Sequence, residues 1–170
     1  MRNQGVIPET GNNYLMKFVK YVLLVLIAGS VLTACKKNDY DAAKQLQADE
    51  ATIKEFIART GGEFERHESG VYYQIAAKGT GNLVYTANTR ISVKYTGRLL
   101  NGQIFDQGEF ADLPLGNLIP GWHIGVPLIQ KGGKIRVLIP SPYGYGPNGA
   151  GTIPPNTVLD FDIELIDAKN

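Results

Sequence analysis

Large apolar side chains recur at the turns in the second half of this chain, where polar residues are the usual choice. The set comprises Tyr95, Phe105, Leu118, Ile119, Trp122, Tyr145, Ile153 and Phe161. One carboxylate, Asp106, belongs to the same pattern. Brought together, these side chains would line an apolar pocket that holds few titratable groups. Such a pocket suits a reaction that needs no nucleophile, metal ion or proton transfer.

The segments between these turns have the patterns of strands and of one short helix. Residues 91–96 alternate apolar and polar side chains, which is typical of a half-buried strand. Asn101-Gly102 is a two-residue hairpin signal, and the chain returns over residues 103–106. A helix begins at Pro120 and reaches about residue 126. Several strands with one helix predict an α+β domain; the other predicted strands are residues 71–77, 135–139 and 160–165.

The order of five short motifs resembles the FKBP-type peptidyl-prolyl cis-trans isomerases. The resemblance covers roughly residues 70–166, and its motifs are YTG at 95–97, FD at 105–106, LIPGW at 118–122, YGYG at 143–146 and IPPN at 153–156. It implies a twisted antiparallel β-sheet wrapped around one short α-helix. It also implies isomerisation of X-Pro peptide bonds without a cofactor, proline-containing polypeptides as substrates, and affinity for macrolides such as tacrolimus or rapamycin.

The resemblance also implies a role for each pocket residue. Trp122 would be the floor beneath the proline ring, and Ile119 would offer its backbone amide to the substrate. Tyr145 would donate its hydroxyl to a substrate carbonyl, and Asp106 would orient the site through hydrogen bonds. The walls would be Tyr95, Phe105 and Phe161. Leu118 and Ile119 would form the rim, and Ile153 would close the far side. Alone, each aromatic would be an ordinary core residue, and Asp106 a turn-capping aspartate.

Rotation about an X-Pro bond is slow because resonance gives the C–N bond double-bond character, with a barrier near ~20 kcal/mol. Water bonded to the imide oxygen supports the charge-separated form. A dry apolar site therefore weakens that form relative to the twisted state, and each ~1.4 kcal/mol gained raises the rate about tenfold. The alternative is a binding module that uses the same cleft to hold unfolded chains with little turnover.

The segment after Asp106 departs from the family pattern. Residues 107–113, QGEFADL, look like a shorter loop than the family usually has, and no arginine occurs there to pair with Asp106. Family members commonly have an aromatic residue in this segment that forms a wall of the pocket. Here Phe110 is the candidate, but alignment would place Ala111 nearer that position, in which case the aromatic is absent. These differences bear on the breadth of the pocket and on macrolide affinity.

The beginning of the chain predicts secretion. Lys17 and Lys20 precede an apolar run over 21–28, and small residues lead to the sequence LTAC ending at Cys35. This pattern resembles a bacterial lipobox, in which the cysteine is lipidated and becomes the mature N-terminus. The alternative is a signal anchor with an incidental thiol. Met16 begins a signal of normal length, so the start is either Met16 or Met1.

We therefore predict a membrane-anchored lipoprotein of the cell envelope, on the periplasmic side or at the cell surface. Residues 1–34 would be the signal region, 35–66 a lipidated cysteine, tether and spacer helix, and 67–170 the isomerase domain. The mature part has 14 basic and 15 acidic residues, since three basic and one acidic residue precede it. That balance shows none of the basic excess expected for nucleic-acid binding.

The segment before the domain predicts a helix over about 41–59, stopped by Gly61-Gly62. Its apolar stripe is thin, and Asp49 and Glu50 interrupt it; the stripe consists of Leu46, Ile53, Phe56 and Ile57. The helix is either a dimerisation arm or a spacer, which lies on the domain or merely holds it off the membrane. The thin stripe favours the spacer and a monomer.

Overall fold

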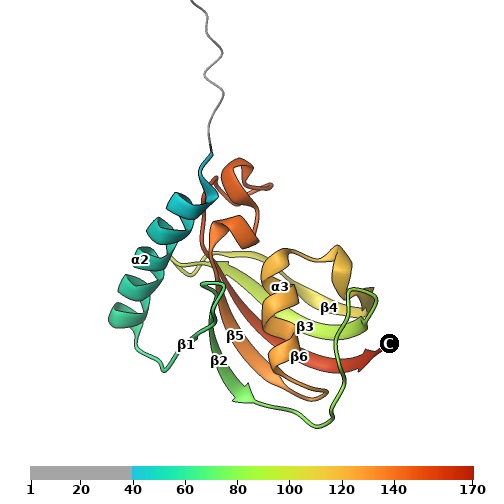
Figure 1. The fold of residues 1–170 in the computed structure, drawn as a ribbon. Coiled ribbons are helices and arrows are strands. Elements are labelled where there is room, and N and C mark those ends of the chain that lie inside the picture. The colour runs from blue at the N-terminus through green and yellow to red at the C-terminus, as the bar shows by residue number, and fades with distance from the viewer. Residues whose placement is uncertain (1–39) are drawn as a thin grey trace, which may run out of the picture. The chain divides into compact units, whose positions relative to one another are not determined.

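The computed structural model describes residues 40–170 of the 170-residue chain. The predicted signal region and Cys35 lie outside the described residues. A six-stranded antiparallel sheet forms the body of the described part, with strand order β1-β2-β5-β6-β3-β4 (Figure 1). The strands are β1 Glu65–Arg66, β2 Tyr72–Ala77, β3 Arg90–Leu99, β4 Ile104–Pro114, β5 Lys134–Ile139 and β6 Leu159–Lys169. The predicted α+β fold with one short helix against the sheet is confirmed.

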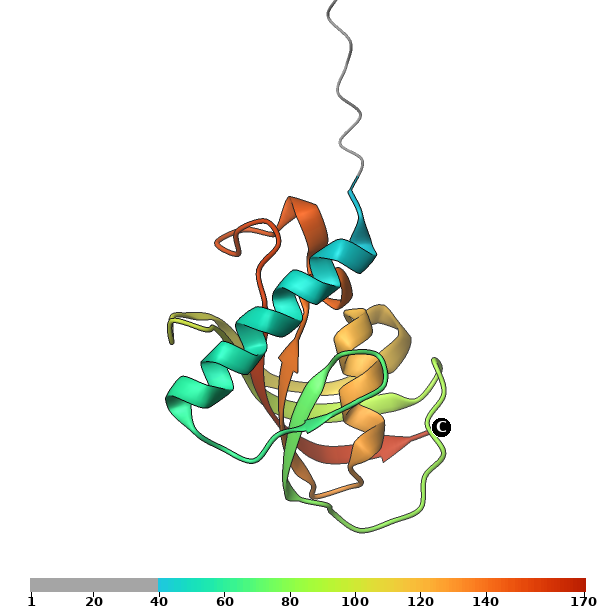
Figure 2. The same ribbon diagram turned by 60° about the vertical axis from the view of Figure 1, so that its left-hand side comes forward.

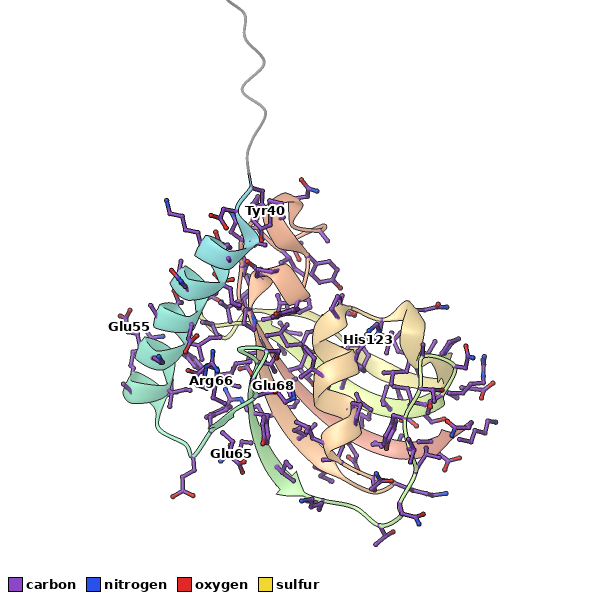
Figure 3. The ribbon with its side chains drawn as sticks, in the orientation of Figure 1. Tyr40, Glu55, Glu65, Arg66, Glu68 and His123 are labelled. Carbon is purple, nitrogen blue, oxygen red and sulfur yellow. The ribbon has the colours of Figure 1, made fainter. Side chains whose placement is uncertain are left out.

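Two α-helices accompany the sheet, α2 Ala42–Thr60 and α3 Pro120–Gly125. Single turns of 3-10 helix lie in the connections: η1 Leu115–Asn117, η2 Val126–Leu128, η3 Ser141–Tyr143 and η4 Gly146–Asn148. Pro120 occupies the first turn of α3, as expected of a residue that lacks an amide proton. His123 on α3 is exposed to solvent (Figure 3).

The β3–β4 hairpin forms at the predicted Asn101-Gly102 turn. Gly102 has a φ of 90°, a conformation that favours glycine. The Leu99 amide donates to the Gln103 carbonyl at 2.9 Å, and the Gln103 amide donates to Asn101 Oδ1 at 2.9 Å. The hairpin places Tyr95 and Asp106 on neighbouring strands.

The segment predicted as a loop after Asp106 is strand instead. Residues 107–113 continue β4 and pair with β3, including Tyr95 with Gly108 and Val93 with Phe110. The pairing shifts register between Ile91 and Val93, and Asp112 on the opposite strand has a φ of 59°. The expectation of a loop was wrong because β3 is ten residues long and offers β4 a partner along its whole length.

Alternation along the strands gives the sheet two apolar faces. On one face, Val137, Ile139 and Phe161 join a buried cluster with Trp122 and Val126 of the α3 region. On the other face, a smaller cluster consists of Ile53 and Phe56 of α2 with Tyr72, Leu138 and Val158. The sheet therefore lies between α3 and α2, as Figure 1 shows on its right and left sides.

Polar contacts stabilise helix α2 at its first turn and also hold it to the sheet. Asp41 caps its first turn by accepting from the amides of Ala43 and Lys44, each at 3.0 Å. Glu50 accepts from Arg66 Nε at 2.9 Å and from Tyr72 Oη at 3.1 Å. The Arg66 bond, followed by that of Lys54, lowers the pKa of Glu50 to about 2. Figure 3 shows Arg66 on the sheet side of α2.

The predicted helix over 41–59 is thus present as α2, and its apolar residues lie on the domain. Ile53 is fully buried and Phe56 is 6% exposed. This is the packing expected of a spacer that lies on the domain. Within residues 40–170, no helix has the length and apolar character that crossing a membrane requires.

Candidate functional site

A cavity of about 160 Å³ opens at one end of the face that α3 covers. It is bounded by β3, β4, α3, β6 and the segment that follows β5. Its lining is Tyr95, Asp106, Phe110, Leu113, Leu118, Ile119, Trp122, Tyr145 and Phe161. Asp106 is the one charged residue of that lining. The structure therefore brings seven of the nine predicted pocket residues to one cavity, and adds two others.

Three rings form the inner wall of the cavity. Trp122 meets Tyr95 edge to face, with ring centroids 5.5 Å apart at 79°, and meets Phe161 at 5.5 Å and 85°. The exposed fractions of Trp122, Phe161 and Tyr95 are 5%, 3% and 6%. Edge-to-face contacts of this kind add about 0.5–1.5 kcal/mol each beyond burial. The inner wall is consequently buried and apolar.

Phe110 forms the outer wall. Its ring stacks on Tyr95 with centroids 5.6 Å apart and an interplanar angle of 19°, and it remains 46% exposed. Of the two candidates that the sequence left open, Phe110 lines the cavity and Ala111 does not. Leu113 lines it too and was missed. Phe110 and Leu113 both belong to β4, so prediction of residues 107–113 as strand would have placed them beside Tyr95.

Phe105 and Ile153 lie near the cavity but not in its lining. Phe105 packs edge to face behind Phe161, with centroids 5.4 Å apart at 87°. A Cβ on Gly97 would come within 2.6 Å of both rings, so only glycine fits there. Ile153 is 7% exposed and belongs to the large core cluster. Phe105 thus supports Phe161, a residue of the lining. The direct contact of Phe105 and Ile153 with substrate remains a prediction.

The side-chain oxygens of the cavity belong to the hydroxyls of Tyr95 and Tyr145 and to the carboxylate of Asp106. Tyr95 Oη donates to Asp106 Oδ2 at 2.7 Å, so Asp106 has the local partner that its sequence neighbours did not suggest. Burial, followed by that bond, holds the pKa of Tyr95 well above its usual range. Burial also raises the pKa of Tyr145, with a smaller contribution from the charge of Asp106. Both tyrosines therefore keep their protons at neutral pH.

The Tyr145 hydroxyl and the Ile119 amide at the cavity have no hydrogen-bond partner among residues 40–170. Ile119 immediately precedes α3, where amides of the first turn lack intrahelical acceptors. The two donors can therefore bind carbonyl oxygens of a ligand that fills the cavity.

Other features of the described part offer less chemistry. A wider hollow of about 460 Å³ lies on the outer face of the sheet, and charged residues including Lys94, Arg136 and Glu164 line it. Lys134 and Glu164 form an ion pair across it at 3.3 Å. Within residues 40–170, no three His, Cys, Asp or Glu side chains gather to hold a metal ion.

Comparisons with known proteins agree with this geometry. The model of the FKBP-type peptidyl-prolyl cis-trans isomerase family matches residues 83–166. FK506-binding protein 1 of Candida glabrata is 39% identical over 109 residues, which are 60% of this chain and 96% of that protein. The FKBP-type peptidyl-prolyl cis-trans isomerase FkpA of Buchnera aphidicola is 38% identical over 154 residues, covering 83% of this chain and 60% of the relative.

A solved structure extends the likeness to the fold. The crystal structure of a peptidyl-prolyl cis-trans isomerase from Pseudomonas syringae matches with a TM-score of 0.63 and 34% identity, covering 78% of this chain and 98% of that one. The chain spans between 49% and 61% of the length of three bacterial relatives that it matches. Motif order, sheet topology and near-complete coverage of two relatives agree, and the chain belongs to the FKBP-type peptidyl-prolyl cis-trans isomerase family.

Proposed function

We propose that this protein accelerates cis-trans isomerisation of X-Pro bonds in exported polypeptides. The observation that carries the proposal is the aromatic cavity with Trp122 as its floor. An apolar cavity of ~150 Å³ holds a ring of benzene's size, so one of about 160 Å³ suits a proline ring. Proline is also the residue whose preceding peptide bond populates both isomers.

The catalytic effect comes from the difference between planar and twisted imide. The planar imide has a polar carbonyl that water solvates, and entry into the cavity between Trp122, Tyr95 and Phe161 removes that water. The twisted imide loses its resonance and its charge separation, so it loses less solvation on entry. The cavity therefore favours the twisted state over either planar state, which is the requirement for catalysis.

The two unpaired donors would hold the peptide on either side of the rotating bond. The Ile119 amide would bind one substrate carbonyl and the Tyr145 hydroxyl another, because both lie at the cavity and neither has an acceptor among residues 40–170. Fixed donors reduce the entropy lost in reaching the transition state. Asp106 would act through Tyr95, whose ring it orients by their hydrogen bond.

A protease-coupled assay on a short X-Pro peptide tests the proposal. We expect turnover that is proportional to enzyme concentration and is inhibited by tacrolimus, if the cavity also accepts macrolides. The chain has a single tryptophan, Trp122, so its fluorescence reports peptide binding independently. A fluorescence change without turnover would identify the alternative function, a polypeptide-binding or chaperone module that uses the same cleft.

The rate should be nearly independent of pH around neutrality. Rotation requires no proton transfer, and the raised pKa values of Tyr95 and Tyr145 keep both hydroxyls protonated. We expect kcat/KM to change by less than about twofold between about pH 6 and pH 8. A bell-shaped profile in this range that Asp106→Asn abolishes would contradict the mechanism.

We also propose that the mature protein is a membrane-anchored lipoprotein of the cell envelope, attached through Cys35, and a monomer. The support is the LTAC sequence at the end of a short apolar run. Several acyl chains would anchor it stably, whereas one chain alone binds only marginally.

Replacing the predicted lipidation residue tests this anchor. Cys35→Ser should leave the precursor uncleaved and without lipid, because the thiol is the acceptor of the acyl group. Mass spectrometry of the protein recovered from membranes is the measurement. A mature N-terminus at any residue other than Cys35 would show that the anchor assignment is wrong.

A further inference from the structure

The connection between β5 and β6 carries Tyr145, and α2 contacts both of its ends. Figure 2 shows α2 running beside the turns that follow β5, and η3 is the element of this connection with which α2 makes its contacts. Tyr145 lines the cavity, and its hydroxyl has no partner among residues 40–170. The helix outside the family motifs therefore touches the segment that presents a functional group.

The first contact is a buried carboxylate on α2. Asp49 is 3% exposed and accepts from the Ser141 amide at 2.7 Å and from Ser141 Oγ at 2.6 Å. Gln45 Nε2 donates to its other oxygen at 2.7 Å. Ser141 is fully buried. Three donors offset the cost of burying a carboxylate, but an apolar pair at such a site is often as stable.

The second contact is apolar and reaches the far end of the connection. Ile53 and Phe56 of α2 pack in one cluster with Leu138, just before the connection, and with Val158 at its end. Leu138 is fully buried and Val158 is 4% exposed. The helix consequently fixes both the entry and the exit of the segment that contains Tyr145.

Hydrogen bonds constrain the backbone between Ser141 and Tyr145. The Tyr143 amide donates to the Pro140 carbonyl at 2.9 Å, and the Gly144 amide donates to the Ser141 carbonyl at 3.0 Å. A Cβ on Gly144 would lie 2.9 Å from Leu159 Cδ1, so this backbone lies directly on the sheet. A shift at Ser141 is therefore transmitted to the residue that follows Gly144.

We propose that Asp49 is a positioning residue, which sets the Tyr145 hydroxyl at the cavity by holding Ser141. The inference rests on the proposed isomerase function, in which that hydroxyl binds a substrate carbonyl. Asp49, which interrupts the apolar stripe of α2, would therefore contribute to catalysis. A helix that precedes the catalytic domain thereby contributes to the geometry of the active site.

The test compares two neighbouring acids of α2 in the full mature chain. Asp49→Ala removes the contact with Ser141, and we expect kcat/KM to fall about tenfold, the worth of one transition-state hydrogen bond. Asp49→Asn keeps an acceptor for Ser141 and should restore most of the rate. Glu50→Ala is the matched control, because Glu50 binds Arg66, Lys54 and Tyr72 but not the connection. It should lower the melting temperature and leave kcat/KM, measured well below that temperature, unchanged.

A double-mutant cycle with Tyr145→Phe separates positioning from general damage to the fold. In the Tyr145→Phe background, Asp49→Ala should have little further effect on kcat/KM, because the hydroxyl that it positions is gone. An equal tenfold loss in both backgrounds, or an equal loss from Glu50→Ala, would overturn the proposal. Amide exchange of residues 141–145 gives a readout without turnover, and it should accelerate in Asp49→Ala but not in Glu50→Ala.

The activities of the wild-type protein and of Asp49→Ala test the proposed function and the positioning role separately. An inactive wild-type protein would refute the isomerase function and, with it, the catalytic role of Asp49. An active wild-type protein whose Asp49→Ala variant keeps full kcat/KM would refute the positioning role alone.

Discussion

Trp122→Leu is expected to reduce kcat/KM on a short X-Pro peptide by about 30- to 100-fold. The indole is the floor of the cavity and contacts both Tyr95 and Phe161 edge to face at 5.5 Å. Leucine keeps an apolar side chain but loses these contacts and leaves room for water above it. The loss corresponds to about 2–3 kcal/mol of apolar burial in the transition state. The protease-coupled assay measures it, at a temperature where circular dichroism shows a folded variant.

Asp106→Asn is the matched comparison, because it tests whether the negative charge in the cavity matters more than its apolar floor. The asparagine oxygen can still accept from Tyr95 Oη, whose bond with Asp106 is 2.7 Å long, so the cavity wall stays in place. We expect the rate to fall by no more than about threefold, since one hydrogen bond keeps its geometry but loses its charge. A loss from Asp106→Asn that exceeds the loss from Trp122→Leu would mean that charge, and not an apolar floor, drives the reaction.

The elements that carry local signals were predictable from the sequence. The alternation in β3 and β6, the Asn101-Gly102 turn and the proline that begins α3 depend on neighbours within a few residues. These elements position Tyr95, Phe161 and Trp122, so the floor of the cavity could be assembled from motifs and strand patterns. The pairing of β3 with β6 was not predicted, because alternation alone does not specify which strands are neighbours.

The outer wall could not be predicted in the same way. Its composition depends on the register between β3 and β4, which shifts between Gly97 and Arg98 and again between Ile91 and Val93. A shift of one residue exchanges the two faces of a strand, so it decides between Phe110 and Ala111. The positive φ of Asp112 is part of this irregularity, and no glycine marks it in the sequence.

The role of α2 was hidden for a different reason. The helix itself follows from composition, but Asp49 looks like a defect in its apolar stripe until Ser141 is placed beside it. The two residues are 92 positions apart in the chain, and serine carries no pattern that would indicate a buried partner. Contacts between distant polar residues of this kind leave no periodic signal.

Removal of α2 is the change for which we expect the largest loss of stability. A chain that begins at His67, the proposed domain boundary, lacks α2 and the two-residue edge strand β1. It should still fold, because the large cluster around Val71, Trp122 and Phe161 lies wholly beyond His67. It loses the burial of Ile53 and Phe56, about 1.5–3 kcal/mol each, and exposes Leu138, which is otherwise fully buried. A cost of about 4 kcal/mol corresponds to a fall of at least ~15 °C in Tm for a domain of this size.

Thermal unfolding of the two chains, followed by circular dichroism, measures this difference. Ile53→Ala in the full mature chain is the graded control, and it should cost about 2–3 kcal/mol, less than removal of the helix, because it leaves a cavity between α2 and the sheet. The shortened chain should keep measurable activity on short peptides, since the floor of the cavity does not involve α2. A Tm within a few degrees of the full chain would show that α2 only rests on the sheet. A shortened chain that is unfolded at low temperature would move the domain boundary to the start of α2 and make the helix part of the folding core.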